Sequence, residues 1–189
     1  MKKALLLAAT VAFITPQAFA QAKSFEGFSV GANLAVAKTT TEPAGFASES
    51  GNTTGLDLQG QYSFALAPQF VLGLGVTLGF GNNKAGTFAG GEVVTKNRVA
   101  FDITPGYAIS STMLIFGKVS SLSADSVFTP VAGAETKDSL SGVGYGFGVR
   151  GLIDKNMFYQ VGYDMNKYNE VNTNKLSSNV LSLGVGYKF

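Results

Sequence analysis

The chain has 189 residues, among them 24 glycines, 15 phenylalanines and 7 tyrosines, and it contains no cysteine, histidine or tryptophan. The formal net charge is only +2, so the charge balance offers no strong positive field for a nucleic-acid partner. The lack of cysteine excludes disulfides and thiolate metal sites, and the lack of histidine removes the commonest general base and a common metal ligand. From the residue types alone we predict no catalytic residue, no cofactor-binding residue and no metal ligand.

The first 20 residues have the pattern of a secretory signal peptide. A lysine pair at positions 2 and 3 precedes an apolar run over 4–14, and Ala18-Phe19-Ala20 fits the A-x-A cleavage pattern. This run is too short to cross a bilayer as a helix. We predict that residues 1–20 are cleaved after export through the Sec pathway and that residues 21–189 form one mature domain. That domain has 12 basic and 12 acidic residues and no net charge.

Beyond the signal, apolar side chains recur at every second position. Successive side chains of a β-strand point to opposite faces, so this period predicts strands with one apolar face and one polar or small face. In the second run, for example, Leu56, Leu58 and Tyr62 alternate with Asp57 and Gln59. Runs of about ten residues have the length that a tilted membrane strand needs. Eight of them follow one another along the chain: 28–36, 56–66, 70–80, 98–109, 113–122, 142–151, 157–167 and 179–189.

The connections between these runs alternate between short and long. Short ones are expected at 67–69, 110–111 and 154–156, and long polar ones at 38–54, 81–95, 123–138 and 168–177. Barrels of the bacterial outer membrane have this asymmetry, with tight periplasmic turns and longer extracellular loops. The sequence therefore predicts an all-β fold, an eight-stranded antiparallel up-and-down transmembrane β-barrel. Pro105, within the fourth run, predicts a bulge or the loss of one ladder hydrogen bond.

Alternation alone does not tell which face is inside, because a soluble barrel has an apolar lumen and a membrane barrel has an apolar outer surface. Eight strands leave little internal room, so small residues fit the lumen better than large apolar ones. The second face also carries balanced charge, which is costly in lipid but can pair inside a barrel. We therefore place the apolar face toward lipid. We predict a lumenal charge network of these residues: Asp57, Arg98, Asp102, Lys118, Arg150 and Asp164.

The predicted network has three levels along the barrel. Counting residues from the short turns places Arg150 and Gln160 lowest, Asp102, Lys118 and Asp164 in the middle, and Asp57 and Arg98 highest. We expect the middle group to form one network and Arg150 to meet a carboxylate of the barrel. Paired charges that fill a narrow barrel are the simpler interpretation, and an ion path along them is the alternative.

The stretch 142–151 contains a G-x-G-x-x-G pattern, the fingerprint of dinucleotide-binding loops. That fingerprint needs its glycines at a strand-to-helix turn. Here Gly142, Gly144, Gly146 and Gly148 share one phase, and no helical period follows them. We interpret the stretch as a strand whose glycines line a crowded lumen, and not as a nucleotide-binding loop.

The chain ends in alternating apolar residues that close on a terminal phenylalanine: Leu183, Val185, Tyr187 and Phe189. Together with the glycine-rich stretch 142–148 and the aromatic motif at 159–163, this ending resembles the small outer-membrane β-barrel superfamily of OmpA-like, OmpX-like and opacity-type porin-family proteins. The resemblance implies that the four terminal residues form the signal read by the barrel-assembly machinery. It also implies residence in the outer membrane of a Gram-negative bacterium, in contact with outer-membrane lipid.

From these features we expect a non-enzymatic envelope protein that supports membrane integrity and contacts a host or surface ligand through its long loops. Two loop aromatics, Phe46 and Phe128, are candidate contacts, although covering the barrel mouth is the simpler role for each. The alternative function is a narrow porin that passes ions or very small solutes. Enzymes of similar architecture use a histidine base beside a serine, and this chain has no histidine.

Overall fold

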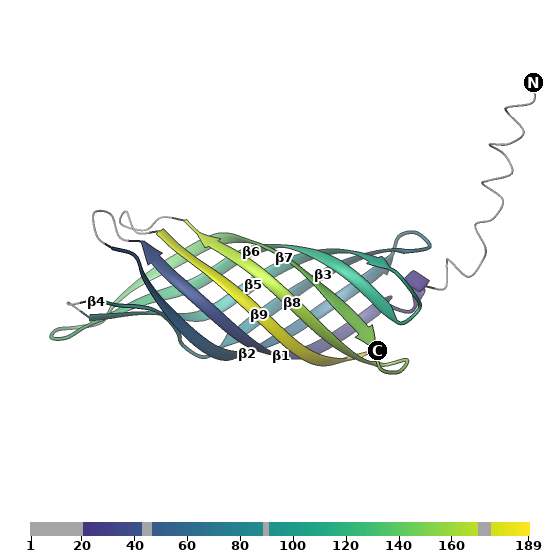
Figure 1. Ribbon diagram of the computed structural model, residues 1–189, viewed down its shortest axis with the longest axis horizontal. Coiled ribbons are helices and arrows are strands. Elements are labelled where there is room, and N and C mark those ends of the chain that lie inside the picture. The colour runs from purple at the N-terminus through teal and green to yellow at the C-terminus, as the bar shows by residue number, and fades with distance from the viewer. Residues whose placement is uncertain (1–20, 43–46, 89–90, 170–174) are drawn as a thin grey trace, which may run out of the picture.

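The computed structural model describes residues 21–42, 47–88, 91–169 and 175–189, and these residues form a β-barrel with tilted strands (Figure 1). The strands among them are β1 (Gly27–Glu42), β2 (Glu49–Ala65), β3 (Phe70–Phe80), β4 (Asn83–Phe88), β5 (Gly91–Ala108), β6 (Met113–Pro130), β7 (Thr136–Leu152), β8 (Met157–Tyr168) and β9 (Lys175–Lys188). Within the described part of the chain, no helix is long and apolar enough to cross a membrane.

Eight of the strands close into a ring. Starting from β3, the hydrogen-bonded order is β3-β2-β1-β9-β8-β7-β6-β5, and β5 pairs with β3 to complete the circle. Every pairing is antiparallel. β4 is not part of this ring. It pairs with residues 91–95 of β5, which precede the residues of β5 that pair with β3. The predicted eight-stranded antiparallel barrel is therefore confirmed, with one additional short strand.

The four long connections are shorter than predicted, because most of their residues extend the strands. β1 stays paired with β2 as far as Thr41, and β6 stays paired with β7 as far as Phe128, so 38–54 and 123–138 are largely hairpin. The other two connections contain β4 and the first residues of β5 and β9. A strand that rises above the lipid no longer needs an apolar face. The hydrophobic period therefore ends before the backbone pairing does, which is why the prediction placed the boundaries too early.

The two faces of the barrel wall match the predicted phase. On β1, Leu34 is 62% exposed, whereas the next residue, Ala35, is only 2% exposed. Large apolar side chains point outward in the same way on all eight strands of the ring. Aromatic residues pair at the strand ends, as where the rings of Phe28 and Phe189 lie 5.8 Å apart. An outer surface this apolar is suited to lipid and not to water.

The ladder between β5 and β6 has two irregularities. Pro105 has no partner on β6, although the register on either side of it is unchanged, because proline has no backbone N–H to donate. The predicted irregularity is thus the loss of ladder bonding and not a bulge. A true bulge occurs earlier on β5, at Asn97, whose φ is 50°. The extra residue lets both Thr95 and Arg98 turn away from solvent, although they are three positions apart.

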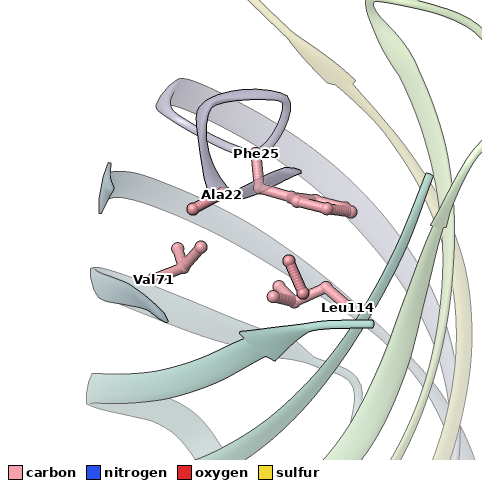
Figure 2. Packing of buried hydrophobic residues seen from close by; sticks show 5 residues of the cluster. Ala22, Phe25, Val71 and Leu114 are labelled. Carbon is pink, nitrogen blue, oxygen red and sulfur yellow. The ribbon is translucent and has the colours of Figure 1, made fainter. Parts of the chain in front are cut away.

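An apolar cluster closes the end of the barrel at which the short turns lie, which is the periplasmic end in barrels of this kind (Figure 2). Ala22 and Phe25, from the turn before β1, are 0% and 3% exposed and pack against β-strand residues inside the wall. The N–H of Ala22 donates to the carbonyl of Pro68 at 3.2 Å, which ties this turn to the β2–β3 connection. The periplasmic cluster consists of Ala22, Phe25, Val71, Ala108 and Leu114.

A second apolar cluster lies inside the opposite end, where the long hairpins leave the barrel. The extracellular cluster consists of Ala85, Ala124, Leu140 and Leu176, with Val93 and Tyr168 packed beside it. These side chains come from six different strands. The Thr41 hydroxyl on β1 donates to the Ala85 carbonyl on β4 at 3.0 Å. β4 is therefore bonded both to β5, through the strand ladder, and to β1, through this hydroxyl. Neither cluster was predicted, because the sequence favoured a lumen of small and polar residues throughout.

Candidate functional site

Polar side chains in the lumen meet in a recurring arrangement, in which two residues on next-nearest strands touch across a glycine on the strand between them. Lys118 on β6, Gly146 on β7 and Asp164 on β8 are partners in register. The Lys118 Nζ lies 2.8 Å from the Asp164 carboxylate. A Cβ on Gly146 would collide with Oδ1 of Asp164. The missing side chain is therefore what allows the ion pair to form.

The ion pair between Asp57 and Arg98 has the same construction. Asp57 on β2 and Arg98 on β5 both lie in register with Gly79 on β3, and Arg98 Nη2 is 3.1 Å from Asp57 Oδ1. A Cβ on Gly79 would lie 2.7 Å from the guanidinium carbon. The side chains of both ion pairs are only 14–17% exposed. At that burial, loss of one partner leaves a charge without compensation.

A third contact of this kind joins two amides. Gln160 on β8 and Asn33 on β1 lie in register with Gly184 on β9, and Gln160 Nε2 donates to Asn33 Oδ1 at 2.7 Å. The same Nε2 donates to Gln59 Oε1 at 2.9 Å. Asn33 and Gln59 were not singled out from the sequence, because the predicted network was built from charged residues and Gln160 entered it only as the neighbour of Arg150.

Arg150 does not meet a carboxylate, which corrects one prediction. It is 5% exposed, and its Nη2 and Nε donate to Gln160 Oε1 at 2.8 and 3.2 Å. Its guanidinium carbon lies 4.4 Å from the centre of the Phe158 ring. Arg150 and Gln160 are direct register partners, so the amide occupies the position that a carboxylate would need. The expected neighbourhood of Arg150 and Gln160 is present, but a neutral amide and an aromatic face stabilise the cation.

Asp102 is separate from the Lys118–Asp164 pair, which corrects the expected three-residue group. Its carboxylate accepts hydrogen bonds from Thr77 at 2.5 Å and from Ser120 at 2.6 Å. Ser120 is the register partner of Asp102 on β6, so the hydroxyl reaches the carboxylate directly. Lys118 instead extends across Gly146 to β8, away from β5. Two charge-assisted hydroxyl contacts thus satisfy Asp102 at 2% exposure.

The lumen around these residues contains two small cavities. One of about 60 Å³ lies between Arg98 and Asp102, and one of about 30 Å³ lies between Arg150 and Gln160. Lys118 and Asp164 line both. Cavities of this size hold a few water molecules at most. The polar layer therefore lies between the periplasmic cluster and the extracellular cluster, and paired side chains fill most of it.

The six lumenal charges sum to zero, with three carboxylates against three cations, and two of the three possible pairs are direct ion pairs. Among the described residues, no group of three or more acidic, histidine or cysteine side chains is placed to hold a metal ion. These ion pairs and hydrogen bonds join strands across the lumen, and their side chains occupy the space along the barrel axis.

The four residues of the predicted assembly signal share one outward face, three of them on β9 and Phe189 directly after it. Leu183 is 59% exposed and Phe189 is 68% exposed, and Val185 and Tyr187 point the same way. The Phe189 N–H donates to the Phe28 carbonyl at 2.9 Å, so the last residue continues the ladder with β1. Their role as a signal stays a prediction. Two further predictions, the signal peptide at 1–20 and the contact residue Phe46, lie outside the described residues, while Phe128 is half-buried on β6.

The comparisons with known proteins agree with this architecture. The family model of the outer membrane protein beta-barrel domain matches residues 4–189. Neisserial surface protein A (NspA) is 20% identical with a TM-score of 0.65, over 87% of this chain and 98% of that chain. Ail, the attachment invasion locus protein of Yersinia pestis, is 15% identical with a TM-score of 0.59, over 87% and 99%. Ail has also been solved in complex with the heparin analogue sucrose octasulfate.

The outer membrane protein OprG from Pseudomonas aeruginosa is 11% identical with a TM-score of 0.50, over 87% of this chain and 96% of that chain. No curated protein matches the sequence. Identities this low show a shared fold alone. The match to the family model, in contrast, spans nearly the whole chain, so the protein belongs to the outer membrane protein beta-barrel domain family.

Proposed function

We propose that the protein is a closed, non-enzymatic barrel that contributes to the integrity of the outer membrane. The observation that carries this proposal is the lumen, in which paired charges lie between the periplasmic cluster and the extracellular cluster. An open porin needs a continuous, wide water-filled path, whereas the described residues around the polar layer leave cavities of only about 60 and 30 Å³. No histidine is present to activate a serine, which favours a role without catalysis.

Conductance measurement separates this proposal from the alternative of a narrow porin. Folded protein inserted in planar lipid bilayers is expected to give no steady single-channel current, because apolar side chains pack inside both ends of the lumen and paired charges fill the layer between them. A large open porin inserted in the same bilayers is the control for detection. Migration on a gel before and after boiling checks that the barrel is folded. A steady, ion-selective conductance from the folded protein would overturn the closed lumen and favour the porin.

The finer part of the proposal is surface binding through the hairpins. A polyanion is one candidate class, since Ail has been solved with a heparin analogue. In this chain, however, Lys84 pairs with Glu92 at 3.1 Å and Lys137 pairs with Asp125 at 3.0 Å, which lowers the attraction of both lysines for a polyanion. These two ion pairs therefore favour a neutral ligand over a polyanion.

Shortening the hairpins tests surface binding. Cells whose barrel has all four hairpin tips cut back to tight turns are expected to lose attachment to immobilised neutral glycans, relative to cells with the full-length protein. Resistance of the same cells to detergent is expected to stay unchanged, because the ring and its lumen are intact. Unchanged attachment after all four tips are removed contradicts the surface role and leaves the role in membrane integrity standing.

A further inference from the structure

The outward apolar face ends in a polar edge on three neighbouring strands, β1, β9 and β8. On β1 the outward position after Val36 is Lys38, and on β8 the outward position after Met165 is Lys167. On β9, between them, Asn179 is the outward residue next to exposed Leu181. Both lysine side chains are exposed. This edge faces the long-hairpin end, so it lies at the level of the lipid headgroups of the outer leaflet.

The register brings the two lysines to either side of β9. Lys38 is the partner of Asn179, and Lys167 is the partner of Ser177, two positions further along the same strand. Neighbouring strands lie about 4.8 Å apart and residues about 3.4 Å apart along a strand, so the two Cα atoms are separated by roughly 12 Å. Two lysine side chains span that gap. The Asn179 amide and the Ser177 hydroxyl lie on the strand between them.

Lys38 and Lys167 differ from three other lysines outside the lumen, which form ion pairs. Lys23 pairs with Glu26 at 3.5 Å, and Lys84 and Lys137 are paired near the hairpins. Among the residues that the structure describes, no carboxylate lies within ion-pair distance of Lys38 or Lys167. Two uncompensated cations beside hydrogen-bond donors, directly above an apolar surface, match the chemistry of a phosphorylated lipid headgroup.

The opposite side of the barrel differs at the same edge. On β6 the outward residue Asp125 accepts from Asn97 at 2.7 Å and from Lys137 at 3.0 Å. Because Lys137 is paired with this carboxylate, the pair offers no net positive charge to an anionic headgroup, whereas the two lysines on the β1–β9–β8 side do. We propose that Lys38 and Lys167, with Asn179 and Ser177, form a binding site for the phosphate of an outer-leaflet lipid. The site depends on the outer-membrane location and not on whether the lumen is closed.

The test uses diphosphoryl lipid A as the probe and the variants Lys38→Gln, Lys167→Gln and their combination. Lipid retention by the folded, detergent-solubilised protein is measured by native mass spectrometry. Removal of a surface lysine weakens attraction to an anionic lipid about fivefold, so the double variant is expected to lose about 25-fold. Lys155→Gln is the matched control, because it removes the same charge from the exposed short turn between β7 and β8. Its retention is expected to equal that of the unchanged protein.

Three outcomes overturn the proposal. The first is retention by the double variant equal to that of the unchanged protein. The second is a loss by Lys155→Gln as large as that of the double variant, which indicates an effect of net charge alone. Inorganic phosphate at millimolar concentration displacing the lipid indicates a site for the free anion and not for a lipid. Migration of each unboiled variant on a gel confirms that the barrel is folded, and the substitutions lie on the exposed surface, where effects on stability are small.

Discussion

Replacing Asp164 with alanine is expected to lower the free energy of unfolding by about 3 kcal/mol, because the substitution leaves the Lys118 ammonium buried without its carboxylate. Lys118 is only 17% exposed, and its Nζ has the Asp164 carboxylate at 2.8 Å. The adjoining cavities of about 60 and 30 Å³ are too small to solvate the cation as bulk water does. The measurement is urea unfolding of protein folded into lipid vesicles, followed by gel migration or tyrosine fluorescence.

The control is the double substitution Lys118→Met with Asp164→Leu. Apolar residues of similar length remove both charges together, so no uncompensated charge remains, and such replacements are often neutral or stabilising. We expect the double variant to recover most of the stability that Asp164→Ala loses. If the single substitution costs less than about 1 kcal/mol, the value typical of an exposed pair, the lumen is wetter than the structure indicates.

Replacing Gly148 with alanine is expected to destabilise the barrel by about 2 kcal/mol, as overpacking of a filled interior does. A Cβ at this lumenal position would collide with the carbonyl oxygen of Val161 on the neighbouring strand and would lie 2.5 Å from Cζ of Phe116. A backbone oxygen cannot turn aside as a flexible side chain can. The strand pairing between β7 and β8 must therefore shift to accept the methyl group, and unfolding in urea reports the cost.

Gly60 provides the matched control for this substitution. It also lies inside a strand, β2, but it faces outward, and a Cβ there would meet no atom within 4 Å. Gly60→Ala is expected to change stability by less than about 0.5 kcal/mol. Equal losses for both variants point to glycine's backbone conformation, and not to lumenal crowding, as the reason for its presence.

The sequence predicted the wall of the barrel well, because the wall follows from one local rule. Alternation along a strand assigns each residue to a face without knowledge of its neighbours, so Leu34 and Ala35 are placed correctly from the order of residues alone. The glycines at 142–148 were assigned to the lumen by the same rule. Their fingerprint-like spacing is a by-product of period two, since every second residue of that strand faces the interior.

Contacts inside the lumen were predicted less well, because they depend on the register of three strands at once. Height along the barrel correctly placed Lys118 beside Asp164. It could not show that the hydroxyl of Ser120, and not Lys118, would contact the Asp102 carboxylate. The apolar clusters were missed for another reason. Leu140 and Leu176 lie on the lumenal face of their strands, beyond the part of the barrel that contacts lipid. In that region the inward side chains are apolar and the outward ones polar, which reverses the pattern of the lipid-facing part.

The contacts across glycine distinguish the correct register from incorrect ones. If β7 and β8 slip by one residue along β6, Tyr145 or Phe147 enters the lumen opposite Lys118, where only a glycine fits. A slip by two residues returns every side chain to the face that it occupies now, so the alternation along the strands does not reject it.

That two-residue slip does change the lumen. It places Gly162 or Asn166 where Asp164 belongs, and Lys118 is then buried without a carboxylate. The lumenal ion pair therefore destabilises an incorrect register that the alternation of the membrane-facing surface does not exclude.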